Sequence, residues 1–171
     1  VNIRPDYRKE FVDDKTLVDE WQMRRQLTGD CLPALLDSPI LDVTRHQRYQ
    51  FPDPAAAHRF TTVEKALQRF GDRRAVILNL RDGFSDMRDL LGYEESLMAL
   101  LLEPQAFSEL FERVVQYNLE LASVARQRYG IEVLATTDDV ANATGLLMRP
   151  DTYFEMIAPH FRRVLQGYKE L

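Results

Sequence analysis

Two short apolar stretches decide the fold class of this chain: residues 75–80 read AVILNL, and residues 131–135 read IEVLA. Each stretch has the length of a strand and lies between polar or turn-forming residues. A nearly continuous apolar run of this length is typical of a strand that is buried on both faces, as in a parallel sheet. We therefore expect both stretches to be parallel strands.

Helical patterns separate and flank the two predicted strands. Pro104 is placed to begin a long helix with one apolar stripe, and Gly130 is placed to end it. Long helical connections between apolar strands imply right-handed βαβ units, so the predicted fold class is α/β. The other predicted helices cover residues 61–70, 84–91, 93–102, 150–157 and 159–168.

The predicted strands are too few to close a (β/α)8 barrel, which typically takes about 250 residues. The chain has 171 residues, begins without Met in a strand-like pattern, and stops directly behind a helical one. We therefore expect a single domain that is a piece of a longer protein. Within it, residues 1–52 and residues 53–171 differ in pattern, and only the second part alternates strands with helices.

Residues 1–52 are expected to form a β-hairpin followed by a long irregular excursion. Residues 1–21 alternate apolar and polar side chains around a polar, turn-like DDKT stretch, which predicts the hairpin. Residues 22–52 contain glycine and proline with little periodicity, and loops of this length are often functional. The chain then enters its helical part at Asp53 and Pro54, which suit a helix start, and residues 61–64 (TTVE) fit a capping box.

Composition and charge exclude several classes of function. The chain is 45% hydrophobic and 29% charged, which is enough apolar side chain for one core, and its formal net charge is −5. A net negative protein is a poor general nucleic-acid binder, because phosphate neutralisation needs a positive face. No apolar run approaches the roughly 18 residues of a membrane span, and the polar first residues do not read as a signal peptide. One cysteine, Cys31, cannot form an internal disulfide, so we expect a cytoplasmic protein.

The carboxyl ends of the predicted strands are where chemistry is expected, because in parallel α/β proteins the connecting loops leave there. Asp138 and Asp139 follow the second strand directly. Two close carboxylates repel each other when both are ionised, so one of them can serve as a proton donor or acceptor. The alternative is structural: Asp139 caps a short helix that follows it, and Asp138 pairs with a nearby arginine.

The first strand contributes candidate substrate-binding residues at its own carboxyl end. Asn79, Arg81 and Arg88 lie in or just beyond it, and an arginine at a strand end can bind a carboxylate or phosphate in bidentate fashion. The alternative is an ion-pair network or a solvated helix face. The three histidines lie far apart in sequence without ligand spacing, so we expect no metal site made from this segment alone.

Six short motifs, in consistent order along nearly the whole chain, resemble the uroporphyrinogen decarboxylase superfamily. More narrowly, the chain is similar to the decarboxylase-like branch, which includes corrinoid-dependent methyltransferases. The motifs are residues 19–21 (DEW), 49–54 (YQFPDP), 91–95 (LGYEE), 137–141 (TDDVA), 149–154 (RPDTYF) and 158–159 (AP).

The resemblance implies a partial (β/α)8 TIM barrel in which this chain is the middle and residues 1–52 are an excursion near the cleft mouth. The chain departs from true uroporphyrinogen decarboxylases in having Arg88 near the position of a strand-end tyrosine, and Asp139 where a serine follows the aspartate. The family's arginine-rich motif and late histidine have no counterpart here. By resemblance, Asp138 and Asp139 would line the cleft floor.

Two chemistries fit the resemblance, and both concern a tetrapyrrole-type substrate or cofactor. Decarboxylation needs no cofactor: arginines hold a polycarboxylate tetrapyrrole, and a carboxyl group supplies a proton or stabilises positive charge. Methyl transfer uses a corrinoid, usually on a partner corrinoid protein, together with zinc, whose histidine and cysteine ligands would lie outside this segment. A homodimer is compatible with either. The segment alone is expected to be inactive, and the other class of interpretation is a non-catalytic or truncated binding domain of the same fold.

Overall fold

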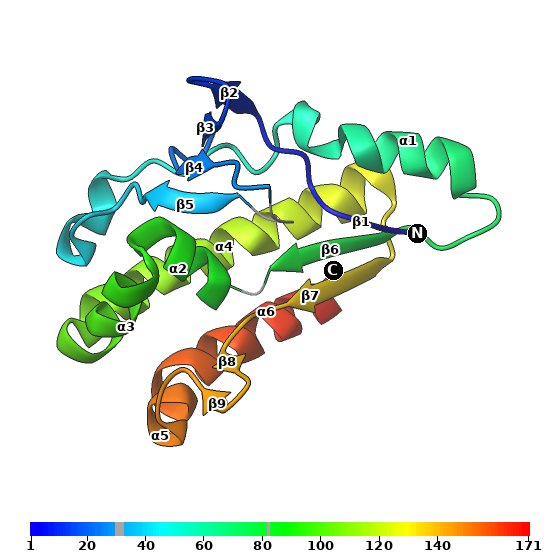
Figure 1. The fold of residues 1–171 in the computed structure, drawn as a ribbon. Helices are drawn as coiled ribbons and strands as arrows, with labels where there is room; N and C mark the ends of the chain where they lie inside the picture. Colours follow the sequence, from blue (N-terminus) through cyan, green and yellow to red (C-terminus); the bar gives the residue numbers. More distant parts are fainter. Residues whose placement is uncertain (30–32, 82) are drawn as a thin grey trace.

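A parallel sheet of three strands forms the centre of the chain in a computed structural model, which describes residues 1–29, 33–81 and 83–171. The strand order is β1-β6-β7, and both neighbouring pairs are parallel. The two apolar stretches are therefore neighbouring parallel strands, as predicted. The bounds are β1(Asn2–Ile3), β6(Ile77–Arg81) and β7(Val133–Thr137). The arrows of β6 and β7 run in the same direction (Figure 1).

The two faces of this sheet have different surroundings. Leu78 and Leu80 of β6 are almost wholly buried, whereas Asn79 and Arg81, which point to the other face, are only partly buried. In β7, Val133 lies beside Ile77 on that second face and is 41% exposed. One face therefore joins the core and the other, which we call the open face, carries polar and partly exposed side chains.

Helices α2, α3 and α4 connect β6 to β7, as the pattern predicted. The long helix α4 buries one stripe, including Phe107, Phe111, Val114 and Leu121, and it ends at Gly130 in the left-handed conformation that glycine adopts without strain. The helices lie on the face of the sheet that carries Leu78, and together they form the core. The bounds are α2(Phe84–Leu91), α3(Tyr93–Leu102) and α4(Pro104–Tyr129).

A second, antiparallel sheet in the order β2-β3-β4-β5 precedes these helices. The predicted hairpin is confirmed for β2 and β3, with Asp13 accepting hydrogen bonds in the turn. Two details were wrong: β1 belongs to the parallel sheet, and residues 22–52 are not wholly irregular, because β4 and β5 extend the hairpin. The bounds are β2(Lys9–Phe11), β3(Thr16–Asp19), β4(Arg24–Gln26), β5(Ala34–Asp37) and the 3-10 helix η1(Val43–Arg48).

The segment between the two sheets is helical but is capped differently from the prediction. The helix predicted after Asp53 is a short 3-10 turn, η2(Ala57–Phe60), followed by α1(Thr61–Phe70). The predicted capping box is wrong: the carboxylate of Asp6 accepts hydrogen bonds from the backbone N–H and the hydroxyl of Thr62, both at 2.7 Å. A distant residue thus satisfies one of the free N–H groups at this helix start.

A small hairpin and a bent helix follow β7. The strands β8(Ala141–Asn142) and β9(Gly145–Leu146) pair antiparallel, and the chain then enters α5(Pro150–Thr152), the π-helical turn η3(Tyr153–Ile157) and α6(Ala158–Glu170). The chain is therefore a mixed α/β protein with parallel and antiparallel sheets, and within its described ranges the strands do not close into a barrel. Cys31, for which we predicted no internal disulfide, lies outside the described residues.

Candidate functional site

The carboxyl ends of β6 and β7 lie side by side, and this brings the predicted site residues into one region. Asn79 pairs in register with Ala135, and Arg81 with Thr137. Asn79 and Arg81 therefore point from the open face, while Asp138 and Asp139 follow β7 directly. On the open face, the hydroxyl of Thr137 approaches the side-chain oxygen of Asn79 at 3.5 Å.

Asp138 binds the start of helix α2. Its carboxylate accepts hydrogen bonds from the backbone N–H of Phe84 at 2.8 Å and of Ser85 at 2.7 Å, and also from the hydroxyl of Ser85. The backbone N–H of Asp139 adds a fourth hydrogen bond at 2.9 Å. A negative charge at this position satisfies free N–H groups of the helix and interacts favourably with its dipole. Asp138 thus holds the loop after β7 against the helix after β6.

Asp139 is in a different environment, although it is the next residue. Its side chain is 64% exposed, and its carboxylate forms an ion pair with Arg88 at 3.2 Å. The same Arg88 nitrogen, Nη1, donates to the backbone oxygen of Asp139 at 2.9 Å. The structural alternative that we considered is therefore wrong in its details. Asp138, and not Asp139, caps a helix; Asp139 pairs with arginine; and a β-hairpin follows Asp139 where a short helix was expected.

Arg88 retains hydrogen-bonding capacity. Its guanidinium lies 5.3 Å from the centroid of the Tyr93 ring, within cation–π distance. Its Nε is buried and has no hydrogen-bond partner among the described residues. Both bonds to Asp139 come from Nη1, and Nη2 has no hydrogen-bond partner within the described part of the chain, so Nη2 is the nitrogen left to take a further carboxylate ligand.

Arg81 is already engaged in a network of ion pairs. Its Nε lies 3.0 Å from Asp86, and its Nη1 donates to Asp89 at 2.8 Å. Arg25 also donates to Asp89, at 2.9 Å. Burial lowers the pKa of Arg81, but Asp86 and Asp89 outweigh burial and raise it above its ordinary value. An ion-pair network was our alternative to substrate binding at this position, and the geometry of Arg81 agrees with it.

Asp86 is the buried carboxyl group of the region. It accepts a hydrogen bond from the side-chain amide of Asn118 at 3.2 Å, in addition to its pairing with Arg81. Burial raises the pKa of Asp86, and the nearby charges of Asp89 and Asp138 raise it further, against the lowering effect of Arg81 and Asn118. Sequence reasoning gave Asp86 no role. The available signal was a carboxylate on the apolar side of α2, among residues that the helical period buries.

A second polar cluster, which sequence reasoning missed, surrounds Arg59 of η2, in the segment before α1. Arg59 is fully buried and donates to Glu20 at 2.9 Å, and His58 lies 3.0 Å from the same carboxylate. The guanidinium also lies 5.3 Å from the ring of Tyr7 and 5.7 Å from the ring of Tyr117. The cluster connects β3 and α4 to the segment before α1, and its charges are paired inside the molecule.

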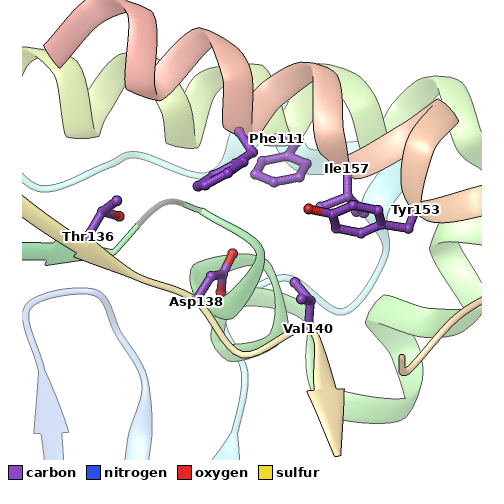
Figure 2. A pocket seen from close by; sticks show the side chains of 7 residues that line it. Phe111, Thr136, Asp138, Val140, Tyr153 and Ile157 are labelled. Atoms are coloured by element: carbon purple, nitrogen blue, oxygen red, sulfur yellow. The ribbon is translucent and has the colours of Figure 1, made fainter. Parts of the chain in front are cut away.

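A cavity of about 250 Å³ lies beyond the end of β7, against the helices (Figure 2). Figure 2 shows the Thr136 hydroxyl and one carboxylate oxygen of Asp138 directed toward its interior. The lining residues are Phe111, Thr136, Asp138, Val140, Tyr153, Ile157 and Phe161. Sequence reasoning found Asp138 but not the aromatic wall, because its members are separated widely along the chain.

The described ranges contain no group of three or more His, Cys, Asp or Glu side chains arranged to hold a metal ion. In the same part of the chain, no helix combines the length and the apolar character needed to cross a lipid bilayer. Comparison with known proteins gives no relative: no protein-family model, curated protein or solved structure matches the chain.

Proposed function

We propose that this chain is part of a (β/α)8 barrel of the uroporphyrinogen decarboxylase type, and that the protein acts on a tetrapyrrole-type substrate or cofactor. The observation that carries the proposal is the open face of the β1-β6-β7 sheet. Polar residues of the adjacent parallel strands β6 and β7 point from this face. The carboxyl ends of the two strands lie side by side, near Arg88 and Asp139. In barrels of this type, active sites lie at the same end of the strands.

The barrel part of the proposal is supported by the exposed side of β7. Among the described residues, the strand pairs only with β6, and its residue Val133 on the open face is 41% exposed. An unpaired strand edge and an uncovered sheet face are unfavourable in an isolated domain. Further parallel strands beside β7 would pair with its free edge, and closure of these strands into a barrel would cover the open face.

For decarboxylation, the geometry assigns different tasks to the two arginines. Arg88 would bind a carboxylate of the substrate through its Nη2, and the exposed Asp139 beside it would stabilise positive charge on a protonated ring. Arg81 would instead fix Asp86 and Asp89. Asp138 would act as a positioning residue, because its carboxylate already accepts four hydrogen bonds.

For methyl transfer, a corrinoid would carry the methyl group and zinc would activate the thiol that accepts it. The described residues do not fit zinc, since no three metal-binding side chains come together. No step of our proposal passes through the metal. The cavity of about 250 Å³ is also too small for a four-ring macrocycle, which would have to lie against the open face.

A binding screen tests the proposal. The protein is titrated with coproporphyrin, cobalamin and zinc, and binding is read by absorbance and by thermal shift. A ligand at 100 times its Kd stabilises the folded state by about 2.7 kcal/mol. Stabilisation by porphyrin alone selects decarboxylation, and stabilisation by cobalamin alone selects methyl transfer.

The site assignment is tested with Asp139→Ala, which should weaken binding of the effective ligand at least tenfold. Asp151→Ala is the matched control, because Asp151 is also an exposed carboxylate paired with an arginine, and it lies on α5, outside the site. Equal affinity in Asp139→Ala and wild type would show that the site is misplaced. No binding of either tetrapyrrole would contradict the proposed function and leave a non-catalytic domain of the same fold.

A further inference from the structure

The cavity beyond β7 is separate from the open face. In the parallel register Thr136 pairs with Leu80, and Leu80 is buried against the helices. Side chains of paired residues in a parallel sheet point to the same face. Thr136 therefore points toward α4 and α6, whereas Asn79 and Arg81 point away from them. A ligand in this cavity would lie between sheet and helices.

The walls and the volume of the cavity define the size of a ligand. Phe111, Tyr153 and Phe161 supply aromatic surface, and Val140 and Ile157 supply aliphatic surface. A cavity of about 150 Å³ holds one benzene molecule. The volume here, about 250 Å³, suits a ligand of one or two fused rings. Two of the lining residues, Tyr153 and Ile157, begin and end a π-helical turn, a feature that is frequent at functional sites.

The polar groups of the cavity define the chemistry of a ligand. The hydroxyl oxygen of Thr136 is buried and has no hydrogen-bond partner among the described residues. Of the two Asp138 oxygens, Oδ1 accepts three hydrogen bonds and Oδ2 accepts one, so Oδ2 retains capacity for a donor. A ligand in the cavity could therefore donate a hydrogen bond to Oδ2 of Asp138 and could form a second hydrogen bond with the hydroxyl of Thr136.

The charge of Asp138 is already compensated. Two backbone N–H groups at the N-terminus of α2 donate to it, and the helix dipole favours a negative charge there. An anionic ligand would be repelled by the carboxylate. A cation would lose its hydration to a single carboxylate that already accepts four hydrogen bonds, without a second acidic partner among the lining residues. A neutral ring that bears an N–H group avoids both costs.

We infer that this cavity is a binding site for a small neutral heteroaromatic group whose ring N–H donates to Asp138. The ring packs among Phe111, Tyr153 and Phe161, and the Thr136 hydroxyl bonds to a second polar atom or to the ring edge. This site is independent of the proposed tetrapyrrole chemistry on the open face.

Indole and benzofuran form a matched pair of probes, because they share shape and size but only indole has an N–H. Isothermal titration of the 171-residue chain should give saturable binding of indole, with benzofuran at least tenfold weaker. Val140→Trp fills the cavity and should abolish indole binding. Thr136→Val keeps the side-chain volume but removes the hydroxyl, and it should lower the affinity for indole less than Val140→Trp does. Far-ultraviolet circular dichroism and the Tm show whether each variant is folded.

Intermolecular nuclear Overhauser effects between indole and the Tyr153 and Phe161 rings provide a second measurement, which needs no variant. Contacts to these rings support the inference. Equal affinities for indole and benzofuran would overturn recognition of the N–H by Asp138. Absence of binding, or binding that a folded Val140→Trp variant retains, would overturn the site itself. If the wild-type chain bound indole but neither coproporphyrin nor cobalamin, only the proposed function would be overturned.

Discussion

The two faces of the β1-β6-β7 sheet come from the same strands but differ in burial and polarity. On the helix-facing side, Leu78 is 0% exposed and Leu80 is 2% exposed, and both pack in the core. On the open face, one residue along in β6, Asn79 and Arg81 are partly exposed and take part in polar contacts. The alternation of a strand thus separates buried apolar side chains from partly exposed polar ones within five residues.

The first prediction tests the face that we assign to stability. Leu78→Ala removes a fully buried side chain and should lower the free energy of unfolding by about 2–5 kcal/mol. Val133→Ala, on the open face of the neighbouring strand, should cost less than about 1 kcal/mol. Urea denaturation measures both. Similar losses in the two variants would mean that the two faces are equally packed.

The second prediction compares the two aspartates beyond β7. Asp138→Ala removes the acceptor of four hydrogen bonds at the start of α2 and should cost about 1–3 kcal/mol of stability. Asp139→Ala removes an exposed ion pair and should change stability by less than about 1 kcal/mol. Thermal unfolding measures the loss of stability in both variants. A larger loss in Asp139→Ala than in Asp138→Ala would contradict the capping role of Asp138.

The third prediction concerns pH and the buried carboxyl Asp86. Burial raises its pKa in the folded state, so above the ordinary aspartate value of about 3.9 the folded protein holds a proton that the unfolded chain has lost. The contribution of Asp86 to stability is therefore present at low pH and is lost as the pH rises through its folded pKa. In Asp86→Asn, the free energy of unfolding should therefore fall less steeply as the pH rises. Urea denaturation between pH 4 and pH 7 measures this.

Asp89 provides the opposite control on the same helix. Burial raises its pKa, but Arg81 and Arg25 outweigh burial and lower it. Its contribution to stability is therefore present above the ordinary pKa and is lost as the pH falls through the folded value. Asp89→Asn should reduce the loss of stability in acid. If both variants changed the pH profile in the same direction, the assignment of the two carboxyl groups would be wrong.

The smallest effect is expected for Asn79→Ala on the open face. The contact between Asn79 and Thr137 is 3.5 Å long and partly exposed, so the variant should change the free energy of unfolding by less than about 0.5 kcal/mol. Equilibrium unfolding in urea measures it. A loss comparable to that of Leu78→Ala would show that Asn79 is a structural residue.

The sequence predicted those parts of the fold that core burial determines. The apolar runs at residues 75–80 and 131–135 located β6 and β7, and the helical period located α1, α2, α3 and α4. The strand bounds lie up to two residues further along, because pairing continues through the polar side chains of Arg81, Thr136 and Thr137. Hydrophobicity marks where a strand is buried, whereas pairing decides where it ends.

The parts that could not be predicted depend on contacts between distant residues. Residues 24–26 (RRQ) lack an apolar alternation and form β4 only because β3 and β5 lie beside them. The role of Asp138 depends on Ser85, 53 residues earlier in the chain. A local pattern placed Asp138 and Asp139 at the strand end, but it could not distinguish the one that binds the helix from the one that remains exposed.

The most direct test of the open face is a spectrophotometric titration of Asn79→Trp with the tetrapyrrole that the wild type binds. A large side chain at this position obstructs the open face but does not enter the core on the Leu78 side. The account predicts at least a tenfold loss of affinity, with a free energy of unfolding within about 1 kcal/mol of wild type. Unchanged affinity in a folded Asn79→Trp variant would contradict it.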